Sequence, residues 1–344
     1  MANLAGYDIG SANWREQLRK NTRRTRFVLV FFVMIYVSLG LIIDGYVLST
    51  FYPDAPLSLI YKALFFFAVT PYATIILSCI AALSILITYS FYDRMMLLGT
   101  DYHRVTATNA ETVLEKQLWN VVEEMKVAAG MNYIPRVYII EANYMNAFAS
   151  GYSERSAMVA ITRGLLEKLD RAELTAVMAH ELSHIRHGDI KLTLTIGVLS
   201  NIMLIVIDIL FHVVIFNPRR SEDNRLAMII IILRYTLPII TVLLTLFLSR
   251  TREYMADAGC VELMRDNQPL ARALLKIHND HQEHTQSYRR EYGLTPHEEV
   301  RRAAYLYDPV GAGVEPIKSL DSALSTHPGL KERLAAIGIS LKGS

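Results

Sequence analysis

An uncharged stretch at residues 64–92, LFFFAVTPYATIILSCIAALSILITYSFY, decides the class of fold to which this chain belongs. A helix rises about 1.5 Å per residue, so this stretch can cross the roughly 30 Å hydrocarbon core of a bilayer even if Pro71 breaks its first turns. Another uncharged run, FVLVFFVMIYVSLGLII (27–43), precedes it. We predict two transmembrane helices, at about residues 27–49 and 68–92.

The composition of the whole chain agrees with a membrane protein. Of its 344 residues 52% are hydrophobic, whereas soluble domains contain about 45–50%, and the mean hydropathy is +0.25. The net charge is only +2, from 35 basic and 33 acidic residues, so the charge balance predicts no nucleic-acid partner. The two cysteines form no CxxC pair, which excludes a disulfide scaffold and a zinc finger.

Two further apolar runs, 192–216 and 226–248, predict a hydrophobic hairpin around the loop 217–225. Each run carries a charge nine residues from the loop, Asp208 before it and Arg234 after it. Equal depth makes these side chains natural partners, and an unpaired charge there would cost about 2.5–3.5 kcal/mol. We therefore predict an ion pair. The alternative is that the runs are partly buried in protein and the charges face a polar cavity, which the three arginines of the loop favour.

Between the second and third runs lies a segment of mixed polarity that predicts an α+β domain. Its expected elements, in order, are a helix capped by Thr108 or Asn109 and stopped at Gly130, strands at 136–141 and 157–161, and a helix that starts with an Asp170–Glu173 capping box and stops at Gly188.

The last of these helices carries the pattern HExxH as His180-Glu181-Leu-Ser-His184. Two imidazoles one helical turn apart project from the same face and can share one metal ion, for which zinc is the usual choice. The alternative is an ordinary amphipathic helix with two solvated histidines.

The third ligand distinguishes the subclasses of such sites, because catalytic zinc uses three protein ligands and keeps one position open. A metzincin needs Gly and His where this chain has His187 and Ile190, and an intramembrane metalloprotease needs a later Asp-Gly, whereas Asp44 and Gly45 come earlier. Directly after the fourth run comes Glu253, followed one helical turn later by another acid. This arrangement suits a His, His, Glu zinc site.

Four segments together resemble the HtpX family of bacterial membrane metalloproteases, and the resemblance covers essentially the whole chain. They are HELSHIRHGD (180–189), SRTREYMADAG (249–259), NAFASG (146–151) and THPGLKER (326–333). The resemblance implies a mostly helical α+β integral membrane protein, with about four transmembrane helices and a cytoplasmic zincin-like catalytic domain of the gluzincin type.

The expected organisation has five parts. They are a basic cytoplasmic tail (1–26), two transmembrane helices (27–92), the first half of the catalytic domain with the HExxH helix (93–191), the hydrophobic hairpin (192–248) and the second half of the catalytic domain with the Glu ligand (249–344).

The expected roles follow partly from chemistry and partly from the resemblance. One Zn²⁺ per chain would be held by His180, His184 and Glu253, and Glu181 would act as the general base that takes a proton from the attacking water. By similarity to related proteases, Asp257 should accept a hydrogen bond from the first imidazole; the alternative is an acid on a helix surface. His327 resembles the family's candidate for stabilising the oxyanion, with Arg333 as its support.

The sequence leaves the roles of two regions open. NAFASG lies where related enzymes have an edge strand, so Asn146, Ala147 and Phe148 are expected to pair with the substrate backbone; the alternative is a plain turn. The histidines of the region 278–316 suggest either a second metal site or, as we expect, a solvated polar insertion.

The two halves of the catalytic domain must meet at one ion, so the hairpin between them crosses the bilayer twice or not at all. Six basic residues before the first span keep the N-terminus in the cytoplasm, and the catalytic domain with it. From His184 to Lys191 the chain covers at most about 10 Å as a helix, which places the ion near the membrane surface.

We therefore expect an endopeptidase of the bacterial cytoplasmic (inner) membrane that acts on membrane proteins or misfolded polypeptides. The resemblance implies quality control of such proteins, and no P-loop motif indicates a need for ATP. A rival hypothesis is a membrane scaffold that binds zinc without hydrolysis, although such a protein needs no base beside its ligands. A transporter fits less well, because the ligands flank the spans.

Overall fold

A computed structural model describes residues 4, 6–10, 13–215, 225–295, 301, 304–309 and 327–341, with backbone alone at 89, 91–95, 215, 225 and 226. The loop 217–225, apart from the backbone of its last residue, lies outside the described residues, as do residues 296–300, 302–303 and 310–316 of the region 278–316, His297 among them. The chain divides into two compact units, which we describe separately. Unit 1 comprises Met1–Arg24, Tyr89–Thr193 and Leu246–Ser344, and unit 2 comprises Thr25–Thr88 and Leu194–Thr245.

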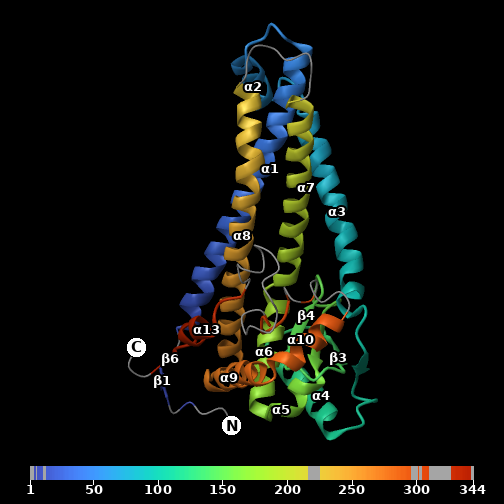
Figure 1. Ribbon diagram of the computed structural model, residues 1–344, viewed down its shortest axis with the longest axis vertical. Helices are drawn as coiled ribbons and strands as arrows, with labels where there is room; N and C mark the ends of the chain where they lie inside the picture. Colours follow the sequence, from blue (N-terminus) through green and yellow to red (C-terminus); the bar gives the residue numbers. More distant parts are fainter. Residues whose placement is uncertain are drawn as a thin grey trace. The chain divides into compact units, whose positions relative to one another are not determined.

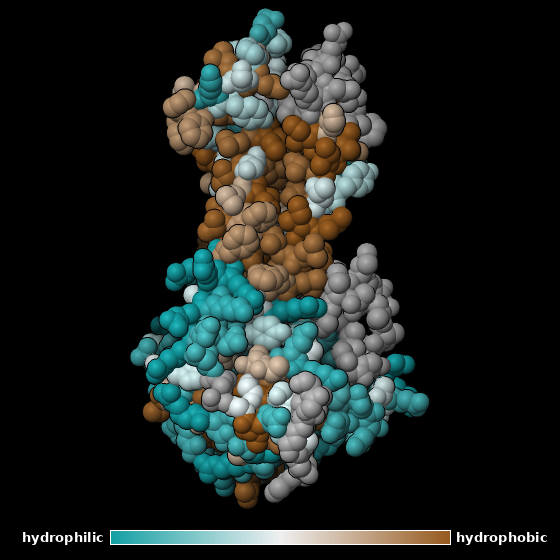
Figure 2. Space-filling view, turned by 90° about the vertical axis from the view of Figure 1, so that its left-hand side faces the viewer, coloured by the Kyte–Doolittle hydropathy of each residue, from teal (hydrophilic) through white to brown (hydrophobic). Residues whose placement is uncertain are grey.

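Unit 2 is built from apolar helices (Figure 1). The helices that contribute to it are α1 (Trp14–Phe51), α2 (Leu57–Phe65), α3 (Tyr72–Leu97), α7 (Asp189–Ile215) and α8 (Arg225–Met264). Among the described residues, α1, α7 and α8 are long and apolar enough to cross a membrane, and the apolar part of α3 at Tyr72–Thr88 is shorter. Figure 2 shows hydrophobic side chains gathered on the surface of these helices.

The helices of unit 2 differ in their bounds from the predicted runs. The expected second span at 68–92 corresponds to α3, which begins directly after Pro71, the residue that we considered able to break its first turns. The carboxylate of Asp44 in α1 accepts hydrogen bonds from the backbone nitrogens of Ala73 (2.7 Å) and Thr74 (3.0 Å). Asp44 therefore has a capping role between two apolar helices.

The predicted ion pair between the third and fourth apolar runs is confirmed. Asp208 in α7 and Arg234 in α8 are in direct contact, and the guanidinium also lies over the ring of Phe211, 4.4 Å from its centroid. The pairing neutralises two charges within otherwise apolar helices.

Unit 1 contains a four-stranded sheet in the order β2-β3-β5-β4. The strands are β2 (Tyr102–Val105), β3 (Arg136–Ile140), β4 (Ala147–Ser150) and β5 (Met158–Thr162). Strands β3 and β5 correspond to the strands predicted at 136–141 and 157–161, and they pair in parallel. Strand β4 lies antiparallel to β5 at the end of the sheet. A separate antiparallel pair joins β1 (Tyr7–Ile9) to β6 (Ile339–Leu341).

Unit 1 also contains helices α4 (Val113–Ala128), α5 (Arg163–Lys168), α6 (Arg171–Arg186), α9 (Gln268–Glu283), α10 (Thr285–Leu294) and α13 (Leu330–Ala336). Helix α6 packs against β4 and α5 against β5, while α4 and α9 pack against α6. The prediction that Thr108 or Asn109 caps α4 is wrong. Thr112 forms the capping box with Glu115, while Asn109 closes the preceding turn by accepting from the backbone of Thr106 at 2.6 Å. Gly130 stops α4 in the left-handed region, with φ of 67°.

The expectation of a solvated insertion in the region 278–316 fits exposed residues such as His284 but is wrong for His281 and for the buried tyrosines. His281 is fully buried, and its Nε2 lies 3.1 Å from the hydroxyl of Tyr292. Burial is the main cause that lowers the pKa of His281 to about 4, so this imidazole is neutral at pH 7. The region belongs to the core of unit 1 through an aromatic cluster that includes Tyr144, Tyr292 and Tyr305.

Candidate metal centre

Helix α6 sets the position of the two histidines. Asp170 caps it as predicted, since its side chain accepts from the backbone nitrogen of Glu173 at 2.9 Å and the Glu173 carboxylate accepts from the backbone nitrogen of Asp170 at 3.0 Å. His180 and His184 then fall one turn apart on the same face, and their Nε2 atoms are 3.1 Å from each other. Gly188, with φ of 67°, ends the helix and turns the chain into α7.

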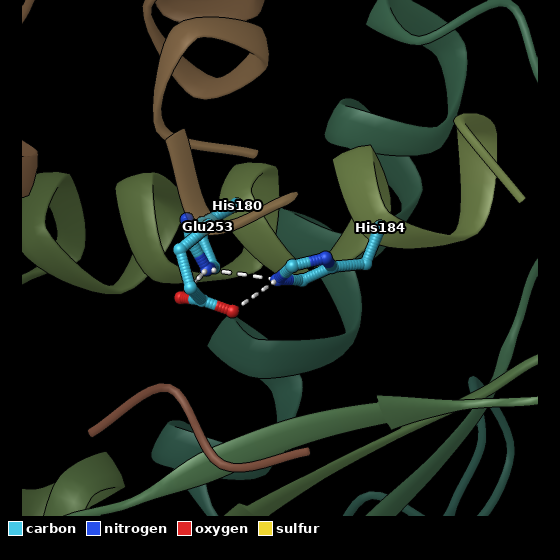
Figure 3. A group of neighbouring side chains, drawn as sticks. All are labelled: His180, His184 and Glu253. Carbon is cyan, nitrogen blue, oxygen red and sulfur yellow. Dashed lines mark hydrogen bonds and ion pairs between the residues drawn. The ribbon is translucent and has the colours of Figure 1, made fainter. Parts of the chain in front are cut away.

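Glu253 of α8 completes the group (Figure 3). Its Oε2 lies 3.7 Å from Nε2 of His180, and its Oε1 lies 3.6 Å from Nε2 of His184. The three donor atoms all lie within 4.8 Å of one another, and the described residues contain no further group of at least three metal-binding side chains arranged in this way. The second metal site weighed for region 278–316 is therefore absent from its described part.

These residues fit a zinc ion. A tetrahedral zinc with Zn–N bonds of about 2.0–2.1 Å separates its two nitrogen ligands by roughly 3.3 Å, close to the observed spacing of the imidazoles. Burial lowers the pKa of His180 more than the neighbouring carboxylate raises it, so the imidazole keeps the neutral form that binds metal. Oε2 of Glu253 is buried without a hydrogen bond to any residue that the structure describes.

Glu181 lies beside the group and is fully buried. Within the described part of the chain, neither of its carboxylate oxygens has a hydrogen-bond partner. Burial raises the pKa of Glu181 to about 7, and the charge of Glu253 adds to the effect. A carboxyl group with such a pKa can accept a proton near neutral pH and release it again.

His180 is supported by a pair of charged side chains from two other helices. Oδ1 of Asp257, one turn beyond Glu253 in α8, lies 3.0 Å from Nδ1 of His180. Arg333 of α13 donates to both carboxylate oxygens of Asp257, at 2.6 and 2.9 Å. Burial alone would lower the pKa of Arg333, but the charges of Asp257 and Glu253 raise it, so the guanidinium stays charged.

His184 has an equivalent partner that we did not predict. Its Nδ1 lies 2.8 Å from Oδ2 of Asp189, the first residue of α7, and Oδ1 of Asp189 lies 3.4 Å from Nε of Arg252. Burial would lower the pKa of His184, but the carboxylates of Asp189 and Glu253 raise it. The signal in the sequence was an acid directly after Gly188, where α6 gives way to α7.

His327 also lies at this site. Its Nδ1 is 3.5 Å from Oε2 of Glu253, and its side chain is buried. Arg333 approaches the same carboxylate, with Nη1 at 3.5 Å from Oε2. Both residues from the segment THPGLKER are thus brought to the ligand group.

The structure places the segment Asn146–Phe148 at the sheet edge next to the site. Ala147 and Phe148 belong to β4, and Asn146 precedes it with its side chain buried. The prediction of an edge strand is confirmed by the strand order. A cavity lined by Ala149, His184, Glu253 and Ala304, among others, lies beside β4.

Comparison with known proteins agrees with this geometry. Residues 113–339 match the family model described as peptidase family M48. The chain is 37% identical over 325 residues to a protease HtpX homolog of Helicobacter acinonychis, covering 94% of this chain and 98% of the relative. A protease HtpX homolog of Helicobacter pylori (strain Shi470) matches with the same identity and coverage.

A solved structure, that of Ste24p from S. mikatae, aligns with a TM-score of 0.46 at 19% sequence identity. The alignment covers 86% of this chain and 64% of that chain.

Proposed function

Because this chain belongs to peptidase family M48 and to its HtpX family of membrane metalloproteases, we propose that it hydrolyses peptide bonds with one Zn²⁺ held by His180, His184 and Glu253. The observation that carries the proposal is the convergence of these three donors beside the buried carboxylate of Glu181. A bound zinc would polarise the scissile carbonyl and make the attacking water more acidic.

Glu181 is the general base in this proposal. Its burial removes the water that would otherwise solvate the carboxylate, and its pKa of about 7 allows it to take a proton from the attacking water and hand it to the leaving amine. His180 and His184 are held in one tautomer by Asp257 and Asp189, which keeps both Nε2 atoms free for the ion.

His327 and Arg333 serve the developing oxyanion. Both are buried and both approach the Glu253 carboxylate, so they face the same side of the ligand group. Positively polarised N–H groups fixed before the reaction stabilise the charge that grows on the carbonyl oxygen. Arg333 acts mainly through Asp257 and orients His180 at the same time.

The substrate binds as an extended strand along β4, with Asn146, Ala147 and Phe148 providing the contacts. Backbone pairing at a sheet edge recognises any unfolded segment with little regard to side chains. The substrates would accordingly be membrane proteins or unfolded polypeptides, hydrolysed without ATP.

The chain is a multi-pass membrane protein, and we place it in the bacterial cytoplasmic membrane with unit 1 in the cytoplasm. The basic side chains before the first apolar run, from Arg15 to Arg26, support this orientation. His184 precedes α7 and Glu253 follows the apolar part of α8, so the two helices cross together or not at all.

Cleavage of casein by the purified, detergent-solubilised, zinc-loaded protein tests the function. We expect cleavage by the wild type, none by Glu181→Gln, and none after a chelator removes the metal. Glu167→Gln is a matched control, because Glu167 is an exposed carboxylate on α5 away from the ligands. Cleavage that survives Glu181→Gln would reject this site as its source, and a zinc-loaded wild type without cleavage would favour the scaffold.

A further inference from the structure

The outer edge of β4 is already paired with another part of the chain. Residues 304–309, here called the strap, lie along it. An isolated antiparallel bridge joins Phe148 to Tyr305, and the backbone nitrogen of Leu306 donates to the carbonyl oxygen of Ala147 at 2.8 Å. The strap thus uses backbone groups that a substrate strand would need.

Asn146 extends this pairing through its side chain. Its Oδ1 accepts from the backbone nitrogen of Tyr307 at 3.2 Å, and its Nδ2 donates to the carbonyl oxygen of Tyr307 at 2.9 Å. A side-chain amide that binds both polar groups of one residue reproduces the contacts of a neighbouring strand. Three successive strap residues are therefore matched to Asn146, Ala147 and Phe148.

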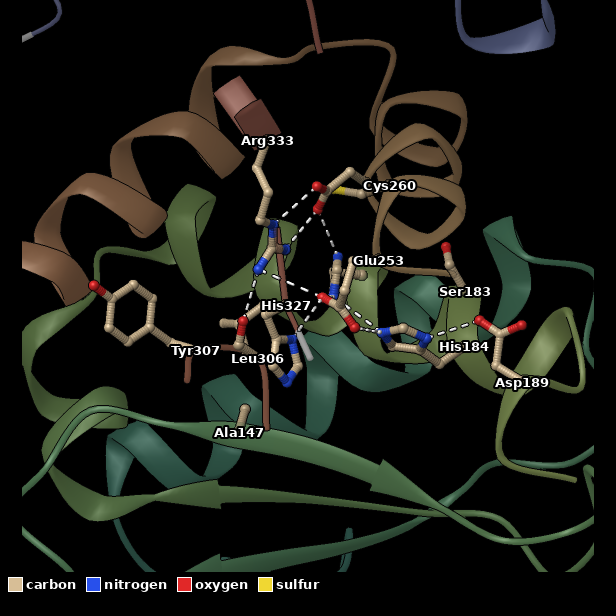
Figure 4. Close-up of polar contacts among 12 residues, drawn as sticks. Ala147, Ser183, His184, Asp189, Glu253, Cys260, Leu306, Tyr307, His327 and Arg333 are labelled. Atoms are coloured by element: carbon tan, nitrogen blue, oxygen red, sulfur yellow. Dashed lines mark hydrogen bonds and ion pairs between the residues drawn. The ribbon is translucent and has the colours of Figure 1, made fainter. Parts of the chain in front are cut away.

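The strap also reaches the ligand group. Nη1 of Arg333 lies 2.7 Å from the carbonyl oxygen of Leu306 and 3.5 Å from Oε2 of Glu253, so a single nitrogen joins the strap backbone to a metal-binding carboxylate. Figure 4 draws Leu306 between Arg333 and Ala147. Ala304 lines the same cavity as His184 and Glu253. A segment of the chain's own backbone thus lies beside the site, where the proposed substrate strand would lie.

The strap is held chiefly by its aromatic side chains. Tyr305 is 1% exposed, its hydroxyl is 3.2 Å from that of Tyr144, and its ring packs against Phe148 with centroids 5.9 Å apart. If the strap left β4, the ring of Tyr305 would be exposed to water. The cost of this exposure keeps the strap on β4 when no substrate is bound. A peptide that places its own aromatic side chain against Phe148 would recover the lost burial.

We propose that the strap is an internal competitor for the substrate strand, and that β4 accepts an extended peptide with a large aromatic side chain only when Tyr305 and Leu306 leave it. This rests on the proposed peptidase function and adds regulation to the same site. Folded proteins offer no such segment, whereas unfolded polypeptides do. The strap therefore restricts cleavage to chains that can replace its pairing and its aromatic contact.

A reversible cross-link tests the proposal. Phe148 and Tyr305 form a pair flanked by hydrogen bonds, in which the Cα atoms lie about 4.5 Å apart and a disulfide fits. We would make Phe148→Cys with Tyr305→Cys in a Cys79→Ser background, because Cys79 is exposed and Cys260 is buried. Oxidation should lower the rate of casein cleavage at least tenfold and reduction should restore it, with each single-cysteine variant as control. Equal rates in the two states would overturn the strap proposal alone.

A second measurement does not depend on hydrolysis. With Glu181→Gln added to the cysteine pair, saturating unfolded casein should slow disulfide formation several-fold, because bound substrate holds the strap away from β4. An unchanged rate would overturn the proposal. Slowed formation together with no cleavage by the zinc-loaded wild type would retain the strap and reject the peptidase function.

A third variant changes the backbone of the strap and leaves Tyr305 and Tyr307 in place. Leu306→Pro removes the N–H that bonds Ala147, and we expect cleavage to rise about tenfold, which corresponds to about 1.4 kcal/mol. Tyr305→Phe, which keeps the ring and removes the hydroxyl that contacts Tyr144, should change the rate less than twofold. A correctly folded Leu306→Pro protein with an unchanged or lower rate would contradict the proposal.

Discussion

Each of the two histidines proposed as zinc ligands lies against a carboxylate of its own. Asp257 supports His180 and Asp189 supports His184, at 3.0 and 2.8 Å from the respective Nδ1 atoms. A carboxylate at Nδ1 fixes the proton there and directs the lone pair of Nε2 to the metal. The two carboxylates are themselves held by arginines, Arg333 and Arg252. In the proposed zinc site, the orientation of both imidazoles thus depends on four charged side chains outside the set His180, His184 and Glu253.

Asp189→Asn tests the support of His184. The amide keeps the shape but loses the charge, so the zinc affinity should fall about 10- to 100-fold. Competition with a chelator of known affinity, followed by measurement of the bound metal, gives this number. Asp266→Asn is the control, because Asp266 is exposed and lies away from the proposed ligands. Its Oδ1 accepts a hydrogen bond of 2.9 Å from the backbone nitrogen of Gln268. Equal zinc affinities of the two variants would contradict a role for Asp189.

At the residue scale, the sequence predicts best what depends on helical spacing. His180 and His184 could be paired because residues one turn apart share a face whatever surrounds them. Asp189 was not predicted, since its approach to His184 depends on how the chain turns at Gly188. The contact of Leu306 with Ala147 joins residues far apart in sequence, so no local sequence pattern indicates it.

Helices α6 and α8 approach each other closely at the site. A Cβ atom added to Gly259 would lie 2.6 Å from Oγ and 2.9 Å from Cβ of Ser183, both shorter than van der Waals contact. Ser183 is itself held by a bond to the carbonyl oxygen of Ala179 at 2.8 Å. The glycine therefore sets the spacing at which Glu253, less than two turns earlier in α8, meets the histidines of α6.

Gly259→Ala should destabilise the protein by roughly 1–3 kcal/mol, because α6 and α8 must separate to admit the methyl group. Thermal unfolding in detergent and the zinc content of the same sample measure the two effects. Gly197→Ala provides the control, since this helical glycine of α7 has nothing within 4 Å of the added Cβ and alanine favours helices. The account is contradicted if both variants unfold at the same temperature with full zinc.

At the scale of elements, the strands at 136–141 and 157–161 and the α6 capping box were predictable, because alternation and capping are local signals. The start of α4 was not, since Asn109 and Thr112 are both good capping residues and only the course of the turn separates them. For α3, Pro71 indicated where the helix could begin, but the cap could not be predicted because Asp44 comes from another helix.

The proposed orientation of the molecule rests on the basic residues before the first apolar run and on the shared metal site that we propose. If unit 1 lies in the cytoplasm and α7 and α8 cross the bilayer, the loop at 217–225 is external. A membrane-impermeant thiol reagent should then label Ser221→Cys in intact cells, in a Cys79→Ser background. Val113→Cys, at a position of unit 1 that is 79% exposed, should be labelled only after the membrane is opened.

The reverse pattern, with Val113→Cys labelled in intact cells, would place unit 1 outside. Labelling of neither position in intact cells would argue that α7 and α8 do not cross.

Bound zinc and casein cleavage, measured on the same preparations of wild type, Glu181→Gln and Glu253→Ala, test the central claim most directly. We predict that the wild type holds one zinc per chain and cleaves, that Glu181→Gln keeps the zinc and does not cleave, and that Glu253→Ala loses both. Cleavage by Glu181→Gln, or full zinc binding by Glu253→Ala, would contradict the account.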